Sequence, residues 1–139
     1  MGVLSTEGKQ LFLEAFLRGE NIPSSFYLRL YNDTPVVGDS LSDLTGEPSG
    51  NGYSPIQVQV NTTDFPTSQA DSDDWTVTTK ALTFTASGGR IPAADSVTYA
   101  VLATTTDDSG KLVAYEALSE ARYLNDGESL TLTFTIKLQ

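Results

Sequence analysis

Acidic side chains are the residues of this chain with the clearest potential for metal chemistry. Asp71, Asp73 and Asp74 lie within one stretch of four residues. Hard cations such as Ca²⁺ take several oxygen ligands, which closely spaced loop carboxylates can supply. Aspartates in such a loop more often accept hydrogen bonds from nearby backbone amides and form turns. The glycine and distant glutamate of a complete calcium loop are absent, so the sequence favours a turn, with cation binding as the alternative.

The usual catalytic groups are missing. The 139-residue chain contains no His and no Cys, which excludes the common nucleophile–base triads. Gly88-Gly89 leads into Pro92 rather than into a helix, so it does not form a phosphate-binding loop. A carboxylate pair for glycoside hydrolysis stays open, although sugar sites usually add aromatic side chains and the chain has one Trp. We predict no catalytic residues, no metal site, no cofactor and no enzymatic activity.

The charge balance narrows the possible partners. Eighteen acidic and eight basic side chains give a formal net charge of −10. A nucleic-acid-binding protein needs a basic surface, and an anionic membrane would repel this chain. No apolar run approaches the roughly 18 residues of a membrane span. We therefore expect neither nucleic acid nor membrane as a partner; the acidity indicates solubility, or docking onto a basic protein surface or a cation.

Alternating polarity predicts which elements would position any functional residue. In residues 129–139 every even-numbered residue is apolar and every odd-numbered one polar. Successive side chains of a strand point to opposite faces, so this segment predicts one strand with a buried and a solvent-facing side. The predicted buried face consists of Leu130, Leu132, Phe134, Ile136 and Leu138.

The same alternation recurs along the chain. It covers residues 25–31, 53–60, 75–85 and 97–118, the last as a hairpin. Lys80 stands where the register between two strands can shift. Short strands at this spacing predict an all-β fold, an antiparallel β-sandwich of jelly-roll or immunoglobulin-like type with seven to eight strands.

A single helical pattern precedes the strands. Ser5 or Thr6 can cap a helix over residues 4–18, and Gly19 can end it. We expect an N-terminal arm and helix over residues 1–22, followed by a single β-sandwich domain over residues 23–139. Three apolar residues on one stripe either cover the core or contact a neighbouring subunit: Leu11, Phe12 and Phe16.

Two further groups are candidate partner contacts. Tyr27, Arg29 and Tyr31 share the predicted outward face of one strand, which fits either a contact patch or cross-strand packing. The long irregular segment 32–52 leaves from the end of this strand; such loops usually bind something or become ordered on assembly. Arg90, a cation in an acidic chain, is expected to pair with a partner carboxylate.

Three segments together resemble a known group of proteins. They are Phe26–Pro35, Leu41–Tyr53, and Tyr99–Thr105 with its return through Gly110-Lys111-Leu112. This layout resembles small virion proteins of tailed bacteriophages, of the kind found as capsid decoration (cement) proteins or as tail-associated β modules. The resemblance spans most of residues 24–138 and carries no catalytic motif.

The resemblance implies a non-enzymatic structural virion protein. It would bind the major capsid protein or other virion proteins on the capsid surface and stabilise the assembled capsid. A homo-oligomer is expected, with a trimer favoured, because modest contacts gain strength when symmetry repeats them. The alternative is a tail or fibre module that contacts the host surface or a glycan.

Overall fold

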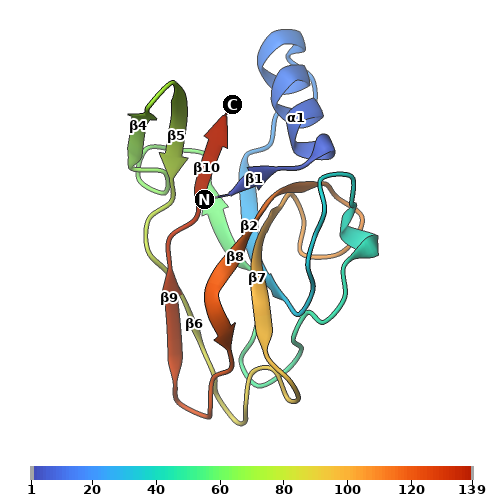
Figure 1. Ribbon diagram of the computed structural model, residues 1–139, viewed down its shortest axis with the longest axis vertical. Helices are drawn as coiled ribbons and strands as arrows, with labels where there is room; N and C mark the ends of the chain where they lie inside the picture. The colour runs from blue at the N-terminus through green and yellow to red at the C-terminus, as the bar shows by residue number, and fades with distance from the viewer. Residues whose placement is uncertain (1, 139) are drawn as a thin grey trace.

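The computed structural model describes residues 2–138 as a β-sandwich with a helix standing at one end (Figure 1). The strands are β1 (Val3–Leu4), β2 (Ser25–Tyr31), β3 (Ile56–Gln59), β4 (Thr67–Asp71), β5 (Asp74–Thr78), β6 (Leu82–Thr85), β7 (Val97–Ala103), β8 (Leu112–Arg122), β9 (Ser129–Leu132) and β10 (Thr135–Leu138). The helical segments are α1 (Thr6–Leu13), the π-helical turn η1 (Glu14–Arg18) and the 3-10 turn η2 (Leu41–Asp43).

The strands form three antiparallel sheets. One has five strands in the order β1-β8-β7-β2-β3, a second pairs β6 with β9, and a third has the order β10-β5-β4. The predicted all-β sandwich with one short N-terminal helix is confirmed. The described part contains ten strands instead of seven or eight, because β1 and β4 are too short or too polar to show alternation and the last predicted strand is divided.

That division arises from a bulge in a two-stranded ribbon. Thr78 pairs with Thr135 in β5–β10, and Leu82 pairs with Leu132 in β6–β9. Three residues on the first side therefore lie opposite two on the second, which is the count of a β-bulge. The predicted register shift at Lys80 is confirmed, and the ribbon passes from one sheet into another at this point.

Thr79 and Phe134 close the bulge. The Thr79 amide donates to the Phe134 carbonyl at 2.9 Å, and the Phe134 amide donates to the Thr79 hydroxyl at 2.9 Å. The hydroxyl thus replaces a backbone acceptor that the irregular ladder lacks, so no buried amide is left without a partner at this position.

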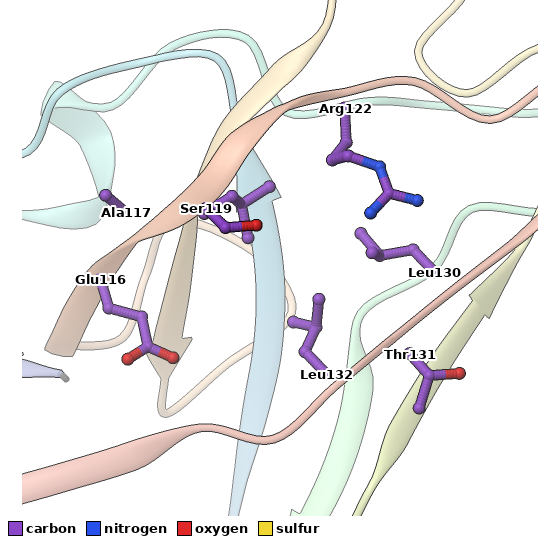
Figure 2. A pocket seen from close by; sticks show the side chains of 8 residues that line it. Glu116, Ala117, Ser119, Arg122, Leu130, Thr131 and Leu132 are labelled. Atoms are coloured by element: carbon purple, nitrogen blue, oxygen red, sulfur yellow. The ribbon is translucent and has the colours of Figure 1, made fainter.

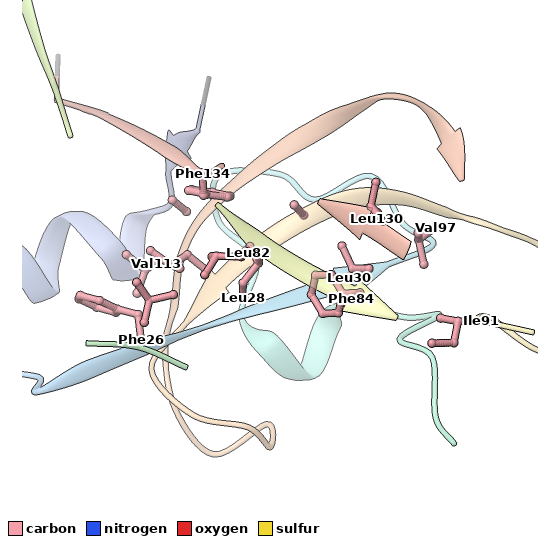
Figure 3. Packing of buried hydrophobic residues seen from close by; sticks show 14 of the residues in the cluster. Phe26, Leu28, Leu30, Leu82, Phe84, Ile91, Val97, Val113, Leu130 and Phe134 are labelled. Carbon is pink, nitrogen blue, oxygen red and sulfur yellow. The ribbon is translucent and has the colours of Figure 1, made fainter. Parts of the chain in front are cut away.

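The core lies between the five-stranded sheet and the β6–β9 ribbon (Figure 3). Its members include Phe26, Leu28, Leu30, Leu82, Phe84, Ile91, Val97, Val113, Leu130 and Phe134. Of the predicted buried face, Leu130 and Phe134 are buried, Leu132 and Ile136 are half-buried, and Leu138 is exposed. The prediction for Leu138 is wrong because β10 runs past the core into the projecting three-stranded sheet.

The helix is anchored on β8. Ser5 is the N-cap, as predicted, and its hydroxyl accepts the Gly8 amide at 3.0 Å and donates to the Leu112 carbonyl. The Leu112 amide donates to the Glu7 carboxylate at 3.0 Å. Gly8 is buried against Val113, where an added Cβ would overlap the Val113 carbonyl. A residue that weakens an isolated helix is therefore required for close packing here. Gly19 ends the helix in the left-handed region, at φ 65°.

Candidate interaction surfaces

Arg29 donates hydrogen bonds to four residues of the described chain, namely Glu47, Thr105, Asp107 and Asp108. It lies on β2 with only 2% of its surface exposed. Its Nε donates to Glu47 Oε2 at 2.9 Å and its Nη2 to Glu47 Oε1 at 2.7 Å. Its Nη1 donates to the carbonyls of Thr105 at 3.2 Å and Asp107 at 2.7 Å. This planar, two-pronged pair is the geometry that guanidinium and carboxylate groups form best.

Glu47 governs the electrostatics of this cluster. Burial alone would lower the pKa of Arg29, but hydrogen bonds and charge from Glu47 outweigh burial and hold that pKa above its usual value. The Tyr53 hydroxyl donates to Glu47 at 2.8 Å and accepts the Leu30 amide at 3.0 Å. Burial, followed by the Glu47 charge, raises the pKa of Tyr53. The guanidinium therefore stays charged and the phenol neutral across the physiological range.

The segment 32–52 is fixed by this cluster and by its own caps. Glu47 connects it to β2, and Asp33 accepts the Thr45 amide at 2.8 Å. Ser40 and Asp43 form a reciprocal capping box around η2. Leu41 and Leu44 pack into a second apolar cluster on the outer face of the five-stranded sheet. A long loop with this many internal contacts is an ordered cover of the sheet.

The predicted solvent-facing side of β2 is therefore wrong for Arg29 and Tyr31. Both side chains are buried beneath the cover formed by residues 32–52. Tyr31 lies within 5.5 Å of the Arg29 guanidinium, and its hydroxyl has no hydrogen-bond partner among the described residues. Tyr27 is half-buried and lines a groove of about 580 Å³ beside α1. Of the three, only Tyr27 remains placed for contact with a partner.

Arg90 is engaged within its own loop. Its guanidinium donates to the carbonyls of Pro92 at 3.1 Å and Asp95 at 2.7 Å. It also lies 4.3 Å from the centre of the Tyr123 ring, in cation–π geometry. These contacts hold the crossing between β6 and β7 in place. Pairing of Arg90 with a partner carboxylate stays a prediction.

The carboxylates at the turn of the β4–β5 hairpin form ion pairs with a lysine of the same chain. Lys137 Nζ lies 3.2 Å from an Asp71 oxygen and 3.0 Å from an Asp74 oxygen. These carboxylates raise the pKa of Lys137 through their hydrogen bonds. Ser72 takes φ 54° at the tip of the turn. Within residues 2–138 no group of three potential ligand residues suited to a metal ion occurs.

The three predicted contact residues of the helix differ in how far they are buried. Leu11 is buried, and Phe12 is half-buried with its ring 6.4 Å from that of Phe26. Phe16 lies in η1 and is 88% exposed. The reason is length: α1 packs on β8, whereas η1 extends past the sheet and buries no residue. The stripe thus packs on the core at Leu11 and Phe12 and is exposed to solvent at Phe16.

Exposed apolar side chains gather where the helix and the β4–β5 hairpin project. The helical segment presents Leu13, Phe16 and Leu17, and Ile22 follows it. The β10-β5-β4 sheet presents Trp75 and Leu138, which pair across its strands. Figure 1 places α1, the hairpin and the end of β10 at the same end of the sandwich. We call this set of residues the apolar end. Apart from Phe16 it was missed from the sequence, although Leu11-Phe12-Leu13 and Phe16-Leu17 form more apolar surface than one helix face can bury.

The described surface includes two grooves. One, of about 240 Å³, lies between β8 and β9; Figure 2 shows Glu116, Ser119 and Arg122 of β8 facing Leu130 and Leu132 of the opposite segment. Burial raises the pKa of Glu116. The lining contains one carboxylate and therefore does not supply the pair needed for glycoside hydrolysis.

The second groove is the one that Tyr27 lines. It contains the carboxylates of Glu7 and Glu14. Both carboxylates already accept hydrogen bonds within the fold, Glu7 from the Leu112 amide at 3.0 Å and Glu14 from the Gln10 side-chain amide at 2.9 Å.

No helix of the described residues is long and apolar enough to span a membrane.

The chain is an all-β sandwich in which a charged network holds a long loop against the sheet and several exposed apolar side chains lie on the elements at one end. The model of the podophage GP4 fiber I protein gp80 family matches residues 4–137, and the chain belongs to that family. A comparison with curated proteins returned no match. The protein is thus a bacteriophage virion protein, in agreement with the resemblance seen in the sequence at that level.

Proposed function

We propose that this protein is a non-enzymatic structural subunit of a phage fibre, attached to neighbouring virion proteins through its apolar end. The observation that carries the proposal is the match of nearly the whole chain to a fibre-protein family. The apolar end adds a place for attachment, because grouped exposed side chains such as Phe16 and Trp75 mark protein contact surfaces.

The rest of the molecule suits a load-bearing part. The segment 32–52 is held on the sheet by Glu47 and Leu41, and the bulge at Thr79 is closed by two hydrogen bonds. Cross-strand hydroxyl pairs, such as Thr83 with Thr131 at 2.8 Å and Thr85 with Ser129 at 2.8 Å, satisfy polar groups on the solvent-facing side of β6–β9. Such a face keeps the free subunit soluble while the apolar end associates.

Particle localisation tests this function. Electron cryomicroscopy of virions carrying an epitope-labelled copy should place the label on a fibre. Label on the head would instead support capsid decoration, the role first expected from the resemblance, and label on neither would overturn both. Host-surface or glycan contact is a separate outcome, read from adsorption of the same virions to cells and from glycan-array binding of the pure protein.

Two matched substitutions test the attachment surface. Trp75 is 53% exposed in the hairpin at the apolar end, and Ala121 is exposed near the end of β8. Trp75→Glu should lower incorporation into virions at least tenfold, whereas Ala121→Glu, which adds the same charge away from the apolar end, should leave it unchanged. Equal incorporation of both variants, each shown to be folded, would contradict attachment through the apolar end.

A further inference from the structure

The sandwich is open along the line between β8 and β9. β8 has 11 residues, and the short strand β1 pairs only with Ala114 and Tyr115 of them. Beyond Tyr115 this edge of β8 has no neighbouring strand among the described residues, and β9 pairs with β6 alone. The groove of about 240 Å³ lies between these two edges. Two strand edges that face a groove without pairing to each other can accept an added strand.

The ladder between β8 and β7 is also irregular beside this groove. Ala117 of β8 pairs with Tyr99, and Arg122 pairs with Val97. A single residue of β7 therefore lies between these two pairs, opposite residues 118–121 of β8. Most of residues 118–121 thus have no partner position in β7. Backbone groups left unpaired at a strand edge are donors and acceptors for an incoming extended segment.

The apolar floor of the groove is an uncovered margin of the core. Leu118 and Leu132 are half-buried and pack against the main core cluster, and Leu130 lines the same groove. Where β1 continues this line, it covers the core itself: Leu4 is buried in the cluster, whereas Val3 is exposed. The chain thus already closes part of the opening with a strand whose side chains alternate between core and solvent.

β1 also indicates the direction of an added strand. It is antiparallel to β8, and Gly2 forms a parallel bridge with Ile136 of β10, the strand that follows β9. A segment that extends the line of β1 is therefore antiparallel to β8 and parallel to β9. Opposite residues of an antiparallel pair have their side chains on the same face. An apolar residue opposite Leu118 therefore covers the floor of the groove.

Charge at the groove favours a carboxylate in the segment. Arg122 lines the groove, and Figure 2 shows its guanidinium directed toward Leu130. Arg122 has no ion pair in the described part of the chain, whereas Glu116, at the other end of the lining, already interacts within the chain. An arginine without a carboxylate partner, in a chain of net charge −10, is complementary to an acidic residue of another protein.

We propose that the groove between β8 and β9 binds an extended segment of a different protein as an added strand, antiparallel to β8, with an apolar residue on Leu118 and a carboxylate at Arg122. The groove is smaller than most small-molecule sites, which measure about 300–1,000 Å³, and its lining follows the two strands. Strand addition takes its affinity from backbone hydrogen bonds and its specificity from alternate side chains.

The segment comes from a different protein because this chain has none to supply. Among residues 2–138 the segments with alternating apolar side chains already form strands of the sandwich. The inference goes beyond attachment through the apolar end, and it stands without the fibre assignment because purified protein can be tested with a peptide.

A synthetic peptide tests the proposal on the full chain. The acetylated and amidated probe Thr-Asp-Thr-Val-Thr-Val-Thr, bound antiparallel to β8, brings its aspartate to Arg122 and its second valine to Leu118. We expect amide NMR shifts and added hydrogen-exchange protection in residues 117–122 and 129–132, with a dissociation constant on the order of 0.1–1 mM because the interface is small. The same peptide N-methylated at both valines should bind at least about tenfold more weakly, because it lacks two backbone donors.

A charge exchange tests the contact at Arg122. Replacing the aspartate of the probe by lysine should weaken binding about fivefold, and Arg122→Glu should do the same with the original probe. The lysine probe with Arg122→Glu restores opposite charges and should restore the affinity to within about twofold. The reversed sequence Thr-Val-Thr-Val-Thr-Asp-Thr, which moves the carboxylate away from Arg122, should bind the unaltered chain about fivefold more weakly.

Two matched substitutions locate the site. Ser119 and Ala121 are both exposed on β8, but only Ser119 lines the groove. Ser119→Tyr fills the groove and should weaken binding of the probe at least about tenfold, whereas Ala121→Tyr should change it less than about twofold. Circular dichroism checks that both variants and Arg122→Glu are folded.

Several results would overturn the inference: no binding at about 5 mM probe, equal binding of the N-methylated or the reversed peptide, no recovery in the charge exchange, or equal effects of the two tyrosine substitutions. Protection of residues 117–122 that rises with protein concentration alone would also overturn it, because a second copy would then fill the groove. Fibre localisation of a protein that does not bind the probe would overturn the inference alone. Binding of the probe by a protein absent from fibres would overturn the proposed function alone.

Discussion

Gly8 and Val113 lie in backbone contact where the helix crosses β8, with no room for a side chain between them. Gly8→Ala would raise the intrinsic helix propensity by about 1 kcal/mol, yet it must force the helix away from the sheet. We expect a net loss of about 1–3 kcal/mol in the free energy of unfolding, measured by urea denaturation. Gly38→Ala is the control, since nothing lies within 4 Å of that position, and it should be near neutral. Stabilisation by Gly8→Ala would refute the close packing.

The buried pair of Arg29 and Glu47 predicts a large effect from a small change. Glu47→Gln removes the closer of two carboxylates that pair with a guanidinium of 2% exposure, and Asp108 remains at 3.3 Å. We therefore expect a loss of about 3 kcal/mol in the free energy of unfolding, the lower end of the cost of breaking a buried pair from one side. Hydrogen exchange should speed up in residues 45–53, since their tether is lost. Glu120→Gln, an exposed change of the same chemistry, should stay within about 0.5 kcal/mol. Equal effects would mean that the pair contributes no more than a surface contact.

The hydrogen bonds of Asp64 should make the free energy of unfolding depend on pH in the acidic range. Its hydrogen bonds from the Lys80 ammonium and the Gln59 amide hold the pKa of Asp64 below its usual value of about 3.8. A carboxylate with a lowered pKa stabilises the fold above the unfolded-state pKa, and this contribution disappears as the pH falls through the folded-state value. Asp64→Asn should therefore flatten the decline of unfolding free energy as the pH falls below the usual carboxyl pKa of 3.8. An unchanged slope would show that other carboxylates dominate acid unfolding.

Substitutions at two adjacent residues of the bulge should affect folding in opposite ways. Phe134 is fully buried and Thr133 is exposed. Phe134→Asp should leave the protein unfolded, by loss of near-ultraviolet circular dichroism and of a cooperative thermal transition. Thr133→Arg should fold with a melting temperature close to that of the unaltered protein. If Thr133→Arg folds but is not incorporated into virions, this solvent-facing surface is also an interface.

Strand alternation predicted the sheets well wherever one face meets the core. The limits of β2 and β7 agree with the segments expected from their patterns, and Ser5 caps the helix as its sequence indicates. In each case short-range physics and tertiary packing favour the same arrangement.

The failures have one physical cause, which is contact between distant segments. Alternation makes Arg29 and Tyr31 outward-facing, but it contains no information about a loop that returns to cover that face. The same holds for Leu138, which continues the pattern of a buried strand after the core has ended. Glu47, the partner that explains Arg29, lies eighteen residues away in an irregular segment and has no local signal.

The bulge at Thr79 and Phe134 also separates two mechanical roles. On one side of the bulge the ribbon belongs to the core, and on the other side the β4–β5 hairpin pairs with β10 and is held by the ion pairs of Lys137. The tip between Ser72 and Asp73 can therefore be lengthened or exchanged without disturbing core packing. It is an insertion point at which a foreign peptide could be displayed beside the apolar end without a change to the residues that stabilise the fold.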